Sequence, residues 1–167
     1  DCYNPIKNFS FVSPNNEVTI KDSIATAAVL DVRKTYRWLA HEAEGEGADI
    51  FLKININEVI KNENNDIIGV SGTGPNGKIT FNSKIVIDAT GFTSTISKAM
   101  GFVTQWKRFG AGAEYEAMVE NADPDTWWLM VGQEYTPAGY AWIFPLGNNI
   151  VRIGVGVGKP ESDVDPT

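Results

Sequence analysis

Three aromatic residues stand at alternate positions of the segment PAGYAWIFP, residues 137–145: Tyr140, Trp142 and Phe144. Side chains of a β-strand point alternately to its two faces, so this spacing predicts a strand with three rings on one face. An eight-residue spacer separates the segment from Gly154 and Gly156. Glycines on a partner strand leave space beside the rings. The two segments together predict a wide apolar groove, which suits a hydrocarbon ligand better than a charged one.

The complete pattern, PxxYxWxFP followed by the spacer and GxG, resembles the signature of the geranylgeranyl reductase family. Members of this family are FAD-dependent enzymes that saturate the double bonds of isoprenoid chains in lipids or in chlorophyll precursors. The resemblance implies that six residues bind the substrate: Tyr140, Trp142, Phe144, Pro145, Gly154 and Gly156. It assigns no catalytic residue, and the proton donor of such a reaction is left unassigned.

A second segment of chemical interest is KIVIDATGFTS at residues 84–94. Its apolar run, 84–89, predicts a strand buried on both faces, and the small residues after it let the backbone approach a ligand. The turn resembles the A-D-G-x-x-S motif of the FAD-dependent hydroxylase and reductase superfamily, with Thr90 in place of the aspartate. The resemblance implies four residues that bind FAD: Asp88, Ala89, Gly91 and Ser94. Residues 54–56 separately match the strand whose main chain meets the adenine in relatives, which adds Ile56 as a fifth. The alternative interpretation is a core strand followed by an ordinary turn.

Residues 31–47 have apolar side chains three and four positions apart and end in glycine, which predicts an amphipathic helix. Part of this segment resembles a helix of the same superfamily, but Val32 stands where that family has arginine, and Arg33 lies one position away. One residue turns a helical side chain by about 100°. An ordinary amphipathic helix is therefore the favoured interpretation.

Alternating patterns and turn residues predict the remaining elements. They are a hairpin in 6–21, a strand in 48–60, further strands of a meander at 67–72 and 78–81, a short helix at 94–100, and long strands at 110–119, 127–133, 140–146 and 150–157. Thr93 or Ser94 is the expected cap of the short helix. Trp127 and Trp128 should place their rings on opposite faces of their strand.

The predicted fold class is α+β, an antiparallel substrate-domain sheet plus part of an FAD-binding α/β domain of the hydroxylase-like kind. Residues 1–30 would supply strands on the substrate side. Residues 31–101 would supply the helix, β-meander and strand of a partial FAD-binding domain, and 102–167 a partial substrate-binding sheet. In that sheet Glu114 and Glu116 are expected on a solvated face.

Composition excludes several function classes. The formal net charge is -7 over 167 residues, which argues against nucleic acid as a partner because binding to phosphate needs clustered cations. One cysteine, Cys2, and one histidine, His41, allow neither an internal disulfide nor a His/Cys metal site. The sequence has neither a long apolar run nor a signal peptide pattern, which predicts a cytoplasmic protein, with peripheral membrane contact inferred from the substrate class.

The sequence contains no GxGxxG loop that follows a strand and opens a helix, since the glycines with this spacing at 72–77 lie in a predicted turn between strands. It also lacks the later Gly-Asp segment of such flavoproteins, so we interpret it as a middle segment, inactive in isolation. The whole protein would take FAD, an isoprenoid lipid, and electrons from NAD(P)H or a ferredoxin. One alternative keeps the fold and changes the chemistry to a flavin monooxygenase, a halogenase or an electron-transfer quinone reductase. Another is a non-catalytic lipid-binding or interaction module, whose aromatic face would be a docking patch.

Overall fold

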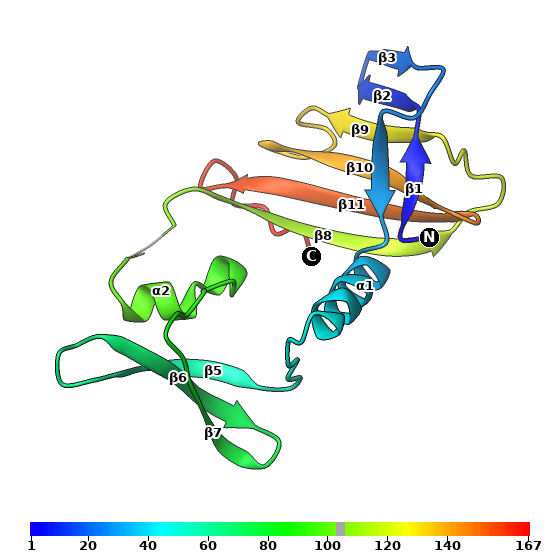
Figure 1. Cartoon of the computed structure of the whole chain (residues 1–167). Coiled ribbons are helices and arrows are strands. Elements are labelled where there is room, and N and C mark those ends of the chain that lie inside the picture. Colours follow the sequence, from blue (N-terminus) through cyan, green and yellow to red (C-terminus); the bar gives the residue numbers. More distant parts are fainter. Residues whose placement is uncertain (103–105) are drawn as a thin grey trace. The chain divides into compact units, whose positions relative to one another are not determined.

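The computed structural model of the chain describes residues 1–102 and 106–167 (Figure 1). These residues form two compact units. The first unit combines Asp1–Glu46 with Lys107–Thr167, and the second is Gly47–Trp106. The helix predicted at 31–47 thus belongs to the first unit. The assignment of residues 31–101 to a cofactor domain stays a prediction.

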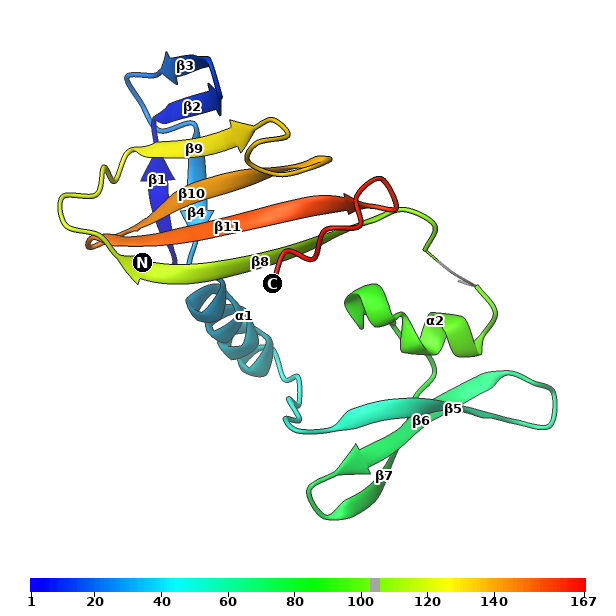
Figure 2. The same cartoon turned by 180° about the vertical axis from the view of Figure 1, so that it is seen from behind.

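A six-stranded sheet forms most of the first unit, in the order β3-β2-β9-β10-β11-β8 (Figures 1 and 2). Its strands are β2 (Asn8–Ser13), β3 (Asn16–Lys21), β8 (Phe109–Met118), β9 (Thr126–Val131), β10 (Gly139–Gly147) and β11 (Ile150–Lys159). The pairings are antiparallel, as the predicted fold class implies, except that β2 and β9 run parallel. No hairpin joins β2 to β9, because the second unit lies between them in the sequence, so hairpin geometry does not fix their direction.

The turn between β10 and β11 is built from Asn148 and Asn149, as the sequence predicted. Their φ angles are 54° and 60°, in the left-handed region that asparagine tolerates better than most residues. Two left-handed central residues match the right-handed twist of the flanking strands. This turn therefore sets the register that places Trp142 opposite Gly154.

A two-stranded antiparallel ribbon, β1 (Tyr3–Ile6) with β4 (Ala27–Leu30), crosses one face of the sheet in both views (Figures 1 and 2). Neither strand was predicted, since four residues are too few to show a clear alternation. Ile6 and Val29 are buried and fasten the ribbon to the sheet. Helix α1 (Val32–Gly45) follows β4, and the Asp31 carboxylate caps it by accepting a hydrogen bond from the backbone N–H of Lys34.

The second unit contains the predicted antiparallel meander. Its strands are β5 (Asn55–Lys61), β6 (Ile67–Gly74) and β7 (Gly77–Asn82). The 3-10 helix η1 (Gly91–Thr93) and the short helix α2 (Thr95–Ala99) follow, and α2 packs against β5. The expected strand at 48–60 begins only at Asn55, which pairs with Thr73, one residue before the partner strand β6 ends.

The prediction of a doubly buried strand at 84–89 is wrong. The segment is irregular, and the side chains of Ile85 and Ile87 are 78% and 85% exposed. An apolar run becomes a strand only when neighbouring strands satisfy its backbone groups. Within the described residues, β5, β6 and β7 pair among themselves and none pairs with this segment.

Among the residues that the structure describes, no helix combines the length and apolar character needed to cross a membrane.

Candidate functional site: an apolar groove on the sheet

The three aromatic residues of the signature lie on one face of β10, which we call the aromatic face of the sheet. The ring centroids of Tyr140 and Trp142 are 5.7 Å apart, and those of Trp142 and Phe144 are 6.0 Å apart. Centroid distances in this range are those of favourable aromatic pairs. The predicted one-sided array of rings is therefore confirmed.

The array continues onto the neighbouring strands. Phe144 stacks on Trp127 of β9 at 5.1 Å, and Trp127 meets Phe9 of β2 edge to face at 5.1 Å. Trp128 lines an apolar pocket of about 300 Å³ together with Ile143. Because Ile143 alternates with the signature aromatics along β10, Trp128 lies on the opposite face from Trp127, as predicted.

Gly154 and Gly156 seat the indole ring of Trp142. A Cβ atom at Gly154 would lie 2.2 Å from Trp142 Cζ2, closer than real Cβ contacts. A Cβ at Gly156 would lie 3.4 Å from Trp142 Cζ3, and one at Gly112 would lie 3.6 Å from Trp142 Cη2. The space that these glycines leave beside the rings is therefore occupied first by the indole of Trp142 itself.

A groove of about 610 Å³ opens next to this indole. Its lining is Phe109, Gly110, Ala111, Gly112, Ala138, Gly139, Tyr140, Trp142, Gly156, Val157 and Gly158. Of the predicted substrate residues, Tyr140, Trp142 and Gly156 line the groove. Phe144, Pro145 and Gly154 are not among the described lining residues. Phe144 and Gly154 instead contact the indole of Trp142, which forms the end of the groove.

Four glycines form what we call the glycine floor: Gly110 and Gly112 of β8, and Gly156 and Gly158 of β11. The strand register places Gly112 opposite Gly156 and Gly110 opposite Gly158. Sequence analysis missed the two β8 glycines as site residues. The signal was present as a GxG at 110–112, which repeats the GxG of β11.

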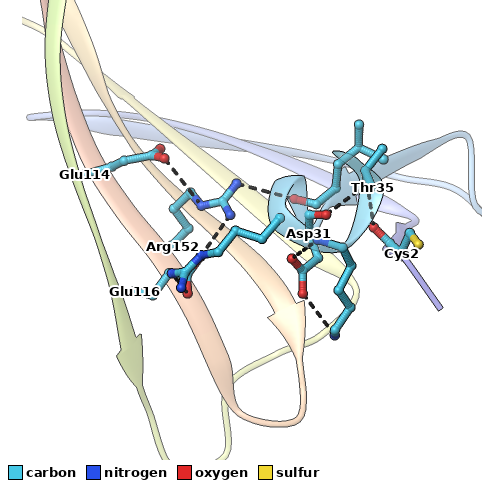
Figure 3. A network of polar contacts seen from close by, with 9 residues as sticks. Cys2, Asp31, Thr35, Glu114, Glu116 and Arg152 are labelled. Atoms are coloured by element: carbon cyan, nitrogen blue, oxygen red, sulfur yellow. Dashed lines mark hydrogen bonds and ion pairs between the residues drawn. The ribbon is translucent and has the colours of Figure 1, made fainter. Parts of the chain in front are cut away.

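A charged cluster lies on the same face beyond Trp142, and it consists of Glu114, Glu116 and Arg152 (Figure 3). The Arg152 guanidinium approaches Glu116 to 2.9 Å and Glu114 to 3.5 Å, and the Arg152 side chain is only 12% exposed. Arg33 of α1 adds a contact of 3.3 Å to Glu116. The expectation of a merely solvated acidic face is therefore incomplete, because a largely buried cation neutralises part of it.

In the second unit, Asp88 organises the turn at 88–97. Its carboxylate accepts hydrogen bonds from the backbone N–H and hydroxyl of Thr90, at 3.0 and 2.6 Å. It accepts two more from the backbone N–H and hydroxyl of Ser97, both at 2.7 Å. The bonds from Thr90 and then those from Ser97 hold the pKa of the Asp88 carboxyl well below its ordinary value.

Thr90, which replaces the aspartate of the superfamily motif, caps α2. Its hydroxyl oxygen accepts a hydrogen bond of 3.0 Å from the backbone N–H of Thr95. Ser94 occupies the expected cap position, but its hydroxyl donates to the Gly91 carbonyl oxygen instead. Its backbone is left-handed, with a φ of 45°. The side chains of Asp88 and Thr90 thus satisfy the first amides of this helix.

The other predicted cofactor residues are Ala89, Gly91 and Ile56. Ala89 and Gly91 are exposed, and a Cβ at Gly91 would meet no atom within 4 Å. Ile56 lines a separate hollow of about 390 Å³ with Phe51 and Phe81. The described lining of that hollow does not include the turn at 88–97, so the structure does not gather the five residues in one pocket.

The fold of the chain recurs in flavin-dependent proteins. A flavin-dependent brominase aligns with a TM-score of 0.64 over 93% of this chain and 39% of its own, at 17% identity. That identity shows the fold alone. A geranylgeranyl bacteriochlorophyll reductase-like protein from Thermoplasma acidophilum aligns with a TM-score of 0.79 and 28% identity, over 92% of this chain and 40% of its own. These likenesses confirm the predicted α+β, hydroxylase-like fold class.

Sequence comparison is more specific. Residues 110–166 match the family model described as the geranylgeranyl reductase catalytic domain. Digeranylgeranylglycerophospholipid reductase 1 of Methanopyrus kandleri is 32% identical over 136 residues, which are 80% of this chain. The chain belongs to the geranylgeranyl reductase family, as the signature indicated. It spans 36% of the length of that relative.

Proposed function

We propose that the full-length protein is an FAD-dependent reductase that saturates C=C bonds in the isoprenoid chain of a lipid. In this reaction the π bond is broken, a hydride forms a C–H bond at one carbon, and a proton forms one at the other. When bound, FAD in its reduced form supplies the hydride and is oxidised. An external donor, NAD(P)H or a ferredoxin, must then restore the reduced flavin after each turnover.

The apolar groove on the aromatic face is the observation that carries this proposal. An isolated C=C bond offers no charge or strong hydrogen-bonding group, so a protein must hold it by shape and apolar contact. The rings of Tyr140 and Trp142 supply that contact, and the glycine floor leaves room for the chain. A groove of this kind also keeps water away from the double bond.

The second unit supports part of the FAD assignment. The exposed backbone at Ala89 and Gly91 can approach a ligand closely, because no side chain projects from Gly91 into the open space beside it. Asp88 and Ser94 act on this backbone by holding the turn, since both make internal hydrogen bonds. Ile56 would contribute an apolar contact. The amides of Thr95 and Ser97 in α2 are already engaged by Thr90 and Asp88, so these two amides do not fit the FAD pyrophosphate.

An isoprenoid lipid resides in a membrane, so the enzyme must meet its substrate at a membrane surface. We therefore include peripheral membrane contact in the proposed function.

The test uses the full-length protein, purified and reduced without oxygen. Addition of a geranylgeranyl lipid should return the visible flavin spectrum to its oxidised form, and the saturated analogue of the same lipid should leave it reduced. Reoxidation by both lipids or by neither would refute the reductase. Oxygen consumption stimulated by the lipid would identify a monooxygenase, and a colourless protein that takes up no FAD would identify a binding module.

A matched pair of variants tests whether the groove binds the substrate. Trp142→Ala should slow reoxidation by the lipid by about tenfold or more while the flavin content stays near that of the wild type. Phe11→Ala changes a ring of β2 whose side chain is 41% exposed and which does not line the groove. It should leave the rate unchanged. Equal loss of flavin and turnover in Trp142→Ala would contradict the groove as the substrate site.

A further inference from the structure

The groove ends abruptly at the indole of Trp142. The aromatic face is built in rows across the strands, and the register aligns Tyr140 with Gly156 in one row and Trp142 with Gly154 in the next. Both residues of the first row line the groove, whereas in the second row only Trp142 does. Gly154, although it bears no side chain, does not extend the groove, because the indole covers it.

Contacts on two sides hold the indole in this place. Three of its atoms, Cζ2, Cε2 and Nε1, lie within 2.7 Å of the point where Gly154 would carry a Cβ. Phe144 stacks on the side of the ring away from Tyr140, with an interplanar angle of 24°. Phe144 is itself backed by Trp127. The indole therefore cannot swing away from the groove without breaking the array of rings behind it.

On β8 and β11, the surface beyond the indole is charged and unsuited to hydrocarbon. The strand register places Glu114 next to Gly154, and Arg152 opposite Glu116 one row further on. These side chains keep part of their surface in water, with 50% of Glu114 and 38% of Glu116 exposed. A hydrocarbon laid over them would remove water from charged groups without offering a hydrogen bond in return, which is unfavourable.

We infer that Trp142 is the end stop of the groove and determines how much isoprenoid chain can be inserted. The inference rests on the proposed function. If the chain enters over the glycine floor and its end abuts the indole, the number of isoprene units between the stop and the reacting bond is fixed. Trp142 then determines specificity for chain length, and Gly154 determines it indirectly, through the position of the indole.

Two substitutions should shift chain-length preference in opposite directions. Trp142→Ala removes the stop and should favour chains longer by one isoprene unit, although the charged cluster limits the gain. Gly154→Ala places a methyl group where the indole now lies, so the ring must move toward the groove and shorten it. That variant should favour chains shorter by one unit. Gly110→Ala is the control, since its Cβ would have no atom closer than 3.9 Å and lies away from the indole.

The experiment measures kcat/KM of the full-length enzyme on prenyl glycerol ethers that differ by one isoprene unit. We expect the ratio of long to short substrate to rise about tenfold in Trp142→Ala and to fall by a similar factor in Gly154→Ala. Gly110→Ala should alter all lengths alike. Trp142→Phe replaces Trp142→Ala if the latter does not fold, with a smaller rise expected. Active variants whose ratios equal that of the wild type would overturn the end stop alone. A wild-type enzyme that reduces none of the ethers would overturn the proposed function instead.

Discussion

The guanidinium of Arg152 donates a hydrogen bond of 3.3 Å to the backbone carbonyl oxygen of Leu30, which lies 122 positions earlier in the chain. Arg152 belongs to β11 of the sheet, and Leu30 is the last residue of β4, just before α1. The same guanidinium contacts Glu116 on β8. One side chain thus ties the sheet to the β1–β4 ribbon that covers one end of the aromatic face.

Replacement of Arg152 by methionine should lower the free energy of unfolding by about 2 kcal/mol. Hydrogen bonds to charged groups contribute on this scale. The variant also leaves Glu114 without its cation and Glu116 with Arg33 alone. Urea denaturation provides the measurement. Arg108→Met is the matched control, because the Arg108 side chain is 83% exposed in its contact with Glu161 and should change stability by no more than about 0.5 kcal/mol. Equal losses of unfolding free energy in the two variants would contradict the stabilising role of Arg152.

Asp88 should make the turn at 88–97 sensitive to acid. Its folded-state pKa lies below the ordinary carboxyl value of about 3.9, so its carboxylate stabilises the turn fully at pH values above that range. The stabilisation is lost as the pH falls through the ordinary value toward the folded-state pKa. Asp88→Asn should therefore speed amide hydrogen exchange at Ser97 and Thr95 near pH 6.

The difference between wild type and Asp88→Asn should shrink as the pH is lowered below about 3. Asp49→Asn is the control, because it makes the same change in the same unit. The Asp49 carboxylate accepts no hydrogen bond within the described part of the chain. It should leave exchange at Ser97 unaltered. A difference at Ser97 that stayed constant between pH 6 and pH 2 would rule out the carboxylate as its cause.

The hairpin turn at Asn148 and Asn149 predicts a pair of opposite effects. Asn149→Gly should raise the free energy of unfolding by roughly 0.5 kcal/mol, because Asn-Gly is the preferred pair for two left-handed turn residues. Asn149→Ala should lower it by about 1 kcal/mol, since alanine is strained at a φ of 60°. Asn15→Ala, in a turn outside the left-handed region, is the control for loss of an asparagine. Thermal unfolding of the three variants is the measurement. Shifts of the same sign for glycine and alanine at position 149 would exclude this explanation.

Local patterns in the sequence predicted the rings of the groove and Gly156 in its floor, but not the two glycines of β8. The rings of Tyr140 and Trp142 share a face because strand side chains alternate, which needs no knowledge of the partner strands. The pairing of Gly112 with Gly156 depends on the register between β8 and β11, which are joined only through β9 and β10. Such a register is set by packing across the whole sheet, and no local spacing reveals it.

The error at residues 84–89 has a different origin. Periodicity reports which side chains are apolar, whereas a strand also requires partners for its backbone groups, and these lie elsewhere in sequence. Asp88 was predicted to bind FAD, and that role stays a prediction; the sequence could not show that its carboxylate is already engaged by Thr90 and Ser97. Such hydrogen bonds depend on the exact path of the turn, which the motif does not specify.

A matched pair of isoleucines tests the exposed segment. Ile87→Ala should change the free energy of unfolding of this chain by no more than about 0.5 kcal/mol, because the side chain is 85% exposed and supports no packing. Ile96→Ala, in α2 of the same unit, should lower it by about 2 kcal/mol or more, because Ile96 is only 7% exposed and its removal leaves a cavity. Unfolding of this unit by urea can be followed by the fluorescence of Trp106, in a background in which the tryptophans of the first unit are replaced. Amide exchange in β5 is a second way to follow it. A loss at Ile87 as large as that at Ile96 would mean that residues 84–89 form a buried strand after all, as their composition first suggested.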